Sequence, residues 1–130
     1  MVLAQLIDSD MLLVLVNSAE SIKAPTNEVK LHYYAFFAKQ EGIRFTYDFQ
    51  VLRSLYSRAL HEDLKNLEEG DYLETGSDFH VTVKGKSWLN NLPNEAEKTQ
   101  QKLTEILKQY SGKDEIILFK EAYAKITKGL

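Results

Sequence analysis

Residues 56–85, YSRALHEDLKNLEEGDYLETGSDFHVTVKG, decide the expected fold, because a helical pattern gives way to a strand pattern within them. Three leucines spaced i, i+4 and i+7 follow Ser57, a residue type that caps helix N-termini, and the pattern closes at Gly70. They are Leu60, Leu64 and Leu67. A turn at 75–78 then separates two strand-like segments, of which 79–83 alternates apolar and polar side chains. The predicted strands are 72–74 and 79–83, so a β-hairpin should follow the helix directly.

Two more helices are predicted upstream. The first is capped within Asp8–Ser9, and its apolar residues nearly surround the helix axis, so it should be buried. The second begins at 26–27 and ends at about Gln40, with Gly42 placed to adopt a left-handed conformation behind it. Between the second and third helices, Arg44–Phe49 alternates polar and aromatic residues, which predicts a short half-buried strand.

Three further helices are predicted downstream of the hairpin. Lys86–Leu92 is a short helix that Pro93 stops, because proline cannot continue the backbone hydrogen bonding. Asn94 and Glu97 have the spacing of a reciprocal capping box at the start of the next helix. The last helix begins at about Asp114.

The last two helices each carry one apolar stripe, which predicts an antiparallel helical hairpin. This hairpin either completes the core of the monomer or pairs two copies of the chain. A dimer would suit a two-fold DNA site. The residues proposed for dimerisation are Leu103, Ile106, Leu107, Tyr110, Phe119 and Tyr123.

The order helix, helix, helix, hairpin is that of a winged helix-turn-helix, in which the third helix and the hairpin, called the wing, face DNA. We therefore expect an α+β, mostly helical fold: a winged helix-turn-helix with two extra C-terminal helices. The winged-helix part covers residues 1–93, and the helical hairpin covers 94–130. With no linker or repeat between them, the two parts should form a single domain.

Three stretches resemble a known group of proteins. Lys30–Ala38 (KLHYYAFFA), the Tyr56-Ser57 pair with its following leucines, and Val81–Gly85 (VTVKG) are similar to the uncharacterised YwgA-type winged-helix proteins. A fainter likeness is to Panacea-type antitoxin domains. The chain departs from both groups at Arg53–Leu55, where they carry Gly-Pro before the Tyr-Ser pair. The resemblance implies a winged-helix fold, with a role as a DNA-binding regulator or as a protein-interaction module.

Composition excludes several classes of protein. The 130 residues contain no cysteine, which excludes disulfides, thiolate zinc sites and a cysteine nucleophile. The longest apolar run near the start, Met11–Val16, is far shorter than the roughly 20 residues that span a bilayer. No basic residue precedes Lys23, so a signal peptide is not expected and the predicted location is cytoplasmic, without membrane contact.

Charge leaves two functions open. The candidate DNA contacts are Arg53, Arg58, His61, Lys65, Asn66, Lys84 and Lys86. However, residues 56–70 carry a net charge of −2 and residues 71–86 a net charge of −1, whereas DNA affinity depends largely on phosphate contacts. The first hypothesis is a non-enzymatic, dimeric DNA-binding regulator. The alternative is an acidic interaction module for a protein partner. In that case the basic residues pair with neighbouring acids on the same helix, and the expected pairs are Arg58–Glu62 and Lys65–Glu69.

No catalytic, metal or cofactor motif is complete. Gly85-Lys86-Ser87 resembles the end of a phosphate-binding loop, but His80 stands where the loop needs its first glycine. The three histidines fall on different predicted elements without ligand spacing. We therefore expect neither an enzyme nor a bound cofactor.

Overall fold

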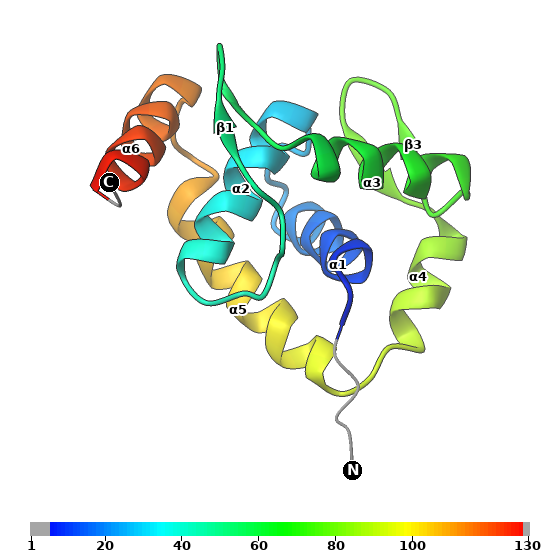
Figure 1. The fold of residues 1–130 in the computed structure, drawn as a ribbon. Helices are drawn as coiled ribbons and strands as arrows, with labels where there is room; N and C mark the ends of the chain where they lie inside the picture. Colours follow the sequence, from blue (N-terminus) through cyan, green and yellow to red (C-terminus); the bar gives the residue numbers. More distant parts are fainter. Residues whose placement is uncertain (1–5, 129–130) are drawn as a thin grey trace.

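The computed structural model describes residues 6–128, and it is mostly helical with two short antiparallel hairpins (Figure 1). The elements are α1 (Asp8–Ser21), α2 (Glu28–Gln40), β1 (Gln50–Val51), β2 (Leu55–Tyr56), α3 (Arg58–Glu69), β3 (Leu73–Thr75), β4 (Phe79–Val81), α4 (Val83–Asn90), α5 (Glu95–Tyr110) and α6 (Glu115–Lys128). The prediction of an α+β, mostly helical chain is confirmed. Among these residues, no helix is both long and apolar enough to cross a membrane.

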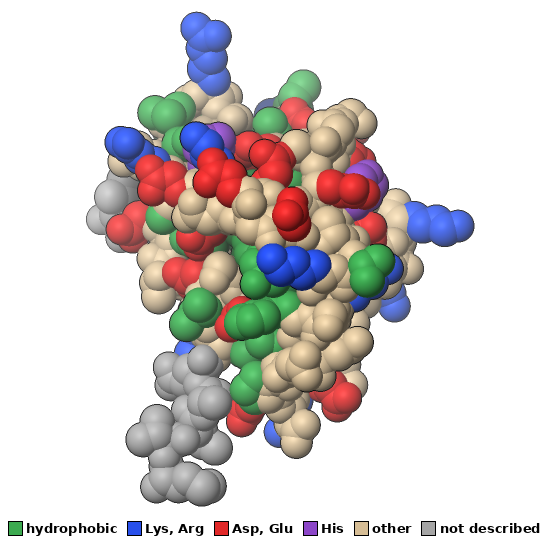
Figure 2. Space-filling model, turned by 90° about the vertical axis from the view of Figure 1, so that its right-hand side faces the viewer, with side chains coloured by type: hydrophobic (Ala, Val, Ile, Leu, Met, Phe, Trp, Pro, Cys, Tyr) green, Lys and Arg blue, Asp and Glu red, His purple; other side chains and the backbone are tan. Residues whose placement is uncertain are grey.

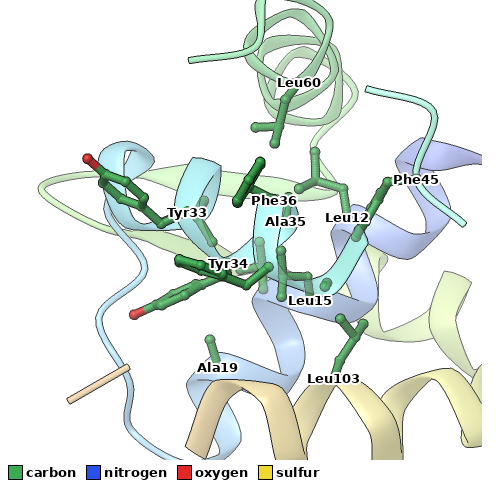
Figure 3. Packing of buried hydrophobic residues seen from close by; sticks show 14 of the residues in the cluster. Leu12, Leu15, Ala19, Tyr33, Tyr34, Ala35, Phe36, Phe45, Leu60 and Leu103 are labelled. Carbon is green, nitrogen blue, oxygen red and sulfur yellow. The ribbon is translucent and has the colours of Figure 1, made fainter. Parts of the chain in front are cut away.

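α1 forms the centre of the core, as its all-round apolar pattern predicted. It contacts α2, α3, α4, α5 and β4, and Met11–Val16 is buried without interruption. Figure 3 shows Leu12 and Leu15 among side chains that include Leu60 of α3 and Leu103 of α5. Each fully buried leucine contributes about 1.5–3 kcal/mol relative to an exposed one, so this helix supplies a large share of the folding free energy.

α2 begins and ends where the sequence predicted. The Asn27 side chain accepts a hydrogen bond from the Lys30 backbone N–H at 3.1 Å. Gly42 follows the helix with φ +101°, a conformation that residues with a Cβ rarely adopt. The aromatic residues of α2 are buried, and the helix contacts α1, α5, α6 and β2.

The strand predicted over Arg44–Phe49 is absent. Phe45 and Tyr47 are buried and Arg44 and Thr46 are exposed, so the alternation is real, but no neighbouring strand pairs with the segment. Its backbone is held by side chains instead. Thr46 N–H donates to Asp8 Oδ1 at 2.9 Å, and the Lys39 ammonium donates to the Tyr47 carbonyl at 2.6 Å. Pairing begins only at β1 and β2.

α3 and the β3–β4 hairpin lie in the predicted order. Ser57 Oγ accepts from Leu60 N–H at 3.3 Å and so caps α3. The hairpin pairs Leu73–Thr75 with Phe79–Val81, and its second strand is shorter than predicted. It ends because Thr82 caps α4, its hydroxyl accepting from the Gly85 N–H at 3.0 Å. The exposed Val83 is therefore the first residue of α4 rather than part of the strand, and the short helix predicted over Lys86–Leu92 starts earlier.

The last two helices pack against different sets of elements. α5 packs against α1 and α2, whereas α6 packs against α2 and lies at the periphery of the molecule (Figure 1). α6 buries Leu118 and Ala122. The predicted capping box is absent, because Asn94 is itself helical and its side chain makes no capping hydrogen bond. Residues 1–5 of the predicted winged-helix part (1–93) and residues 129–130 of the predicted C-terminal part (94–130) lie outside the described residues.

Candidate interaction surface

The outward ridge of α3 alternates in charge. Arg58, Glu62, Lys65 and Glu69 are spaced i, i+4, i+7 and i+11, so they share one helix face, and all four are exposed. Arg58 Nε donates to Glu62 Oε1 at 3.2 Å, which confirms the predicted pair, and the two side chains are 85% and 57% exposed. The predicted Lys65–Glu69 pair does not form an ion pair in the structure. The ridge therefore offers as many carboxylates as cations.

The β3–β4 hairpin and α4 continue this surface with more acids than free cations. The Lys84 ammonium donates to the Gly70 carbonyl at 2.8 Å and lies 4.6 Å from the centre of the Tyr72 ring. Lys86 is exposed on α4. Figure 2 views the molecule from this side and shows Asp and Glu side chains gathered over its upper part, with Lys and Arg separated from one another. Acids on the hairpin segment are Asp71, Glu74 and Asp78.

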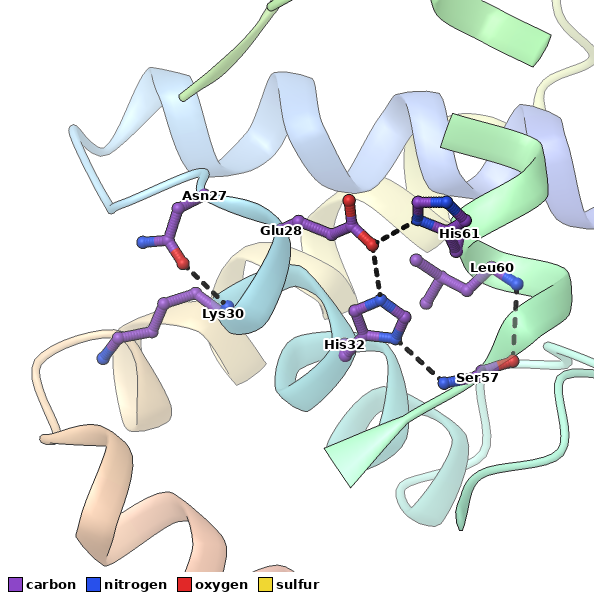
Figure 4. A network of polar contacts seen from close by, with 7 residues as sticks. All are labelled: Asn27, Glu28, Lys30, His32, Ser57, Leu60 and His61. Atoms are coloured by element: carbon purple, nitrogen blue, oxygen red, sulfur yellow. Dashed lines mark hydrogen bonds and ion pairs between the residues drawn. The ribbon is translucent and has the colours of Figure 1, made fainter. Parts of the chain in front are cut away.

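His61 lies in a polar network that joins α2 to α3 (Figure 4). His61 Nδ1 is 2.6 Å from Glu28 Oε2, and the same oxygen is 3.1 Å from His32 Nε2. On its other side, His32 Nδ1 accepts from the Ser57 backbone N–H at 3.1 Å, so the His32 proton resides on Nε2 and is donated to Glu28. The His32 ring also stacks on Tyr56, with 5.0 Å between centroids. The network thus fixes the first turn of α3 against α2.

We predict that acidification weakens folding through His32. Burial lowers the pKa of His32 below its ordinary value of 6.5, and the hydrogen bond to Glu28 opposes this shift only in part. The unfolded chain therefore binds more protons than the folded chain once the pH falls below about 6.5, so stability decreases from there down to the folded-state pKa. Urea unfolding at pH 7.5 and pH 5 measures the loss.

His32→Asn is the matched control for this prediction. The Asn oxygen replaces Nδ1 as the acceptor for Ser57 N–H and does not titrate. The variant should lose less stability than the wild type between the two pH values. An equal loss in both proteins would show that His32 is not the group responsible.

The structure brings together only part of the predicted DNA-contact set. Lys65 and Asn66 are exposed on α3 beside Arg58. Arg53 lies at the tip of the β1–β2 hairpin, a different element from the β3–β4 hairpin that was predicted as the wing. Sequence reasoning missed Glu28 as the acceptor for two histidines, although its i, i+4 spacing to His32 was a local sign of one of these contacts.

Four of the six residues proposed for dimerisation belong to the monomer core. Leu103, Ile106, Leu107 and Tyr110 are all buried against α1 and α2, and Tyr110 stacks on Phe37 at 4.1 Å between centroids. They cannot meet a second copy while the core is intact. Phe119 and Tyr123 stack on each other on α6, where the Tyr123 side chain is half exposed.

Comparison with known proteins adds no assignment to this surface. No family model matches the chain, and no curated protein matches it. Within residues 6–128, no three histidine or carboxylate side chains are grouped so that they could hold a metal ion.

Proposed function

We propose that this protein is a non-enzymatic winged-helix interaction module whose α3 and β3–β4 hairpin present an acidic surface to a basic protein partner. The observation that carries the proposal is that seven acids face four cations over residues 58–86, and that two of these cations are held by internal partners. Arg58 is held by Glu62, and Lys84 by the Gly70 carbonyl. A partner therefore meets mainly carboxylates.

The winged-helix part of the proposal is supported by the direct succession of α3 and a two-stranded hairpin. Ser57 caps the N-terminus of α3, and the outward ridge of the helix is exposed, as a recognition helix requires. One feature differs from the simplest helix-turn-helix motif, which joins its helices by a turn of three to four residues. Here residues 41–57, including the β1–β2 hairpin, connect α2 to α3.

A dimeric DNA-binding regulator is the second candidate. Lys65, Asn66 and Lys86 are exposed, and their side chains make no hydrogen bond or ion pair within the described chain, so they remain available to phosphates or bases. Against this candidate, Glu62 and Glu69 share the ridge with Lys65 and would face the phosphates as well. The balance of these charges favours the protein partner.

Binding to random duplex DNA at low and high salt tests the proposal. The wild type is expected to show no salt-dependent change in fluorescence anisotropy. Glu62→Lys with Glu69→Lys turns the ridge of α3 wholly basic, and it should gain binding that weakens by roughly tenfold or more between 50 and 200 mM salt, because several phosphate contacts form. The same double variant should lose basic proteins that the wild type captures from a cell lysate.

Glu97→Lys with Glu105→Lys is the matched control, since it makes the same change in net charge on exposed positions of α5. It should neither gain comparable DNA binding nor lose the captured proteins. Steep salt-dependent binding of DNA by the wild type would overturn the proposal and support the regulator.

A further inference from the structure

A groove of about 700 Å³ lies at the N-terminus of α1, away from the α3 surface. One wall is α1, the second is the extended segment that follows α2, and the third is the first two turns of α5. Its lining includes Ile7, Met11, Ile43, Arg44, Lys98 and Lys102. Its volume lies in the range of small-molecule sites, about 300–1,000 Å³.

The floor of the groove is apolar and well packed. Met11 and Ile43 belong to the hydrophobic core and are only 4% and 7% exposed. Ile7 projects at the edge with 63% of its surface exposed, so it leaves an apolar side chain in water when the groove is empty. An apolar ligand would cover this side chain and gain free energy from the surface removed from water.

The rim of the groove is cationic. Arg44, Lys98 and Lys102 are exposed around it. The Lys102 side chain lies close to the backbone at Gly42, since a Cβ built on Gly42 would be 3.0 Å from the Lys102 Nζ atom. The two acids that line the groove do not cancel this charge.

The Asp8 carboxylate is one of these acids, and its oxygens already accept hydrogen bonds from the Thr46 N–H and hydroxyl. Glu95, in the first turn of α5, is the other. The lining of the groove therefore carries three cations and two carboxylates, a net charge of +1. A single anionic head group would be attracted to this rim.

We infer that the groove binds a small amphiphile with an unbranched apolar chain and one anionic head group, such as a medium-chain carboxylate. The chain lies on Met11 and Ile43 against Ile7, and the head group meets Lys98 and Lys102, which are neighbours at i and i+4 on α5. A nucleotide fits less well, because no aromatic side chain lines the groove to stack on a base. This inference does not depend on the function proposed for α3.

Isothermal titration with sodium laurate below its micelle concentration tests the inference. The wild type should bind one laurate, and Lys98→Glu with Lys102→Glu should weaken this binding tenfold or more, because two attractive charges become repulsive. Lys108→Glu with Lys125→Glu makes the same net charge change outside the groove and should leave the affinity within about twofold. Far-UV circular dichroism checks that every variant is folded.

A second pair of measurements separates the head group from the chain. Dodecanol, which lacks the charge, should bind more weakly than laurate to the wild type. Thr99→Trp places a large side chain in the groove at a half-buried position and should abolish laurate binding. Absence of laurate binding to the wild type, equal affinity for dodecanol, or equal weakening by the two double variants would each overturn the inference.

Discussion

Leu103→Asp is expected to unfold the protein rather than to separate two copies of it. Leu103 has no exposed surface and packs on α1 at the centre of the core. The substitution removes an apolar side chain and buries a carboxylate without a partner, so the combined loss should exceed about 4 kcal/mol. Because domains of this size have a total stability of about 5–15 kcal/mol, the far-UV circular dichroism signal and the cooperative urea transition should largely disappear.

Two control variants make the Leu103 experiment decisive. Leu103→Met keeps an apolar side chain of similar volume and should cost less than about 1.5 kcal/mol. Tyr123→Asp changes a half-exposed residue of α6 and should leave the fold intact. If Leu103→Asp kept the stability of the wild type and only lowered the mass in light scattering, Leu103 would lie at an interface between copies, and the packing of α5 described here would be wrong.

Gly85→Ala is expected to destabilise the protein by about 2–3 kcal/mol through overpacking. A Cβ at Gly85 would lie 2.4 Å from the Tyr72 carbonyl oxygen and 2.8 Å from Val81 Cγ1. The carbonyl has little freedom to move, because it accepts a hydrogen bond from the Thr82 N–H at 3.1 Å where the β3–β4 hairpin meets α4. Urea unfolding followed by tryptophan fluorescence measures the loss, since Trp88 lies on α4.

Gly76→Ala is the matched control in the same hairpin. No atom lies within 4 Å of a Cβ built at Gly76, so this substitution should change stability by less than about 0.5 kcal/mol. Equal and small effects of the two variants would mean that α4 does not pack closely on the hairpin.

Local signals account for what the sequence predicted correctly about the fold. The caps Asn27 and Ser57 and the left-handed Gly42 depend on hydrogen bonds and backbone angles within a few residues, so they are readable from the chain alone. The segment Arg44–Phe49 was misread because alternation predicts which side chains are buried but not whether a partner strand exists. The apolar stripes of α5 and α6 predict that each helix has a buried face, but they do not specify that α1 and α2 cover α5 or that α2 covers α6.

The candidate site was predictable to a similar extent. The Arg58–Glu62 pair follows from i, i+4 spacing on one helix. The contact between His61 and Glu28 joins residues that are 33 positions apart, and the contact between Lys84 and Gly70 depends on how α4 returns to the end of α3. Counting charges along the chain therefore identified the acidic surface but not which cations are held within it.

The enclosure of α1 has an evolutionary consequence. A helix with neighbours on every side accepts few substitutions, because almost any change of side-chain volume at Met11–Val16 disturbs several elements together. The outward ridge of α3 is exposed and is free to diverge. Descendants of this chain would therefore retain α1 while exchanging the residues of the ridge, so that one scaffold could acquire new partners without losing its fold.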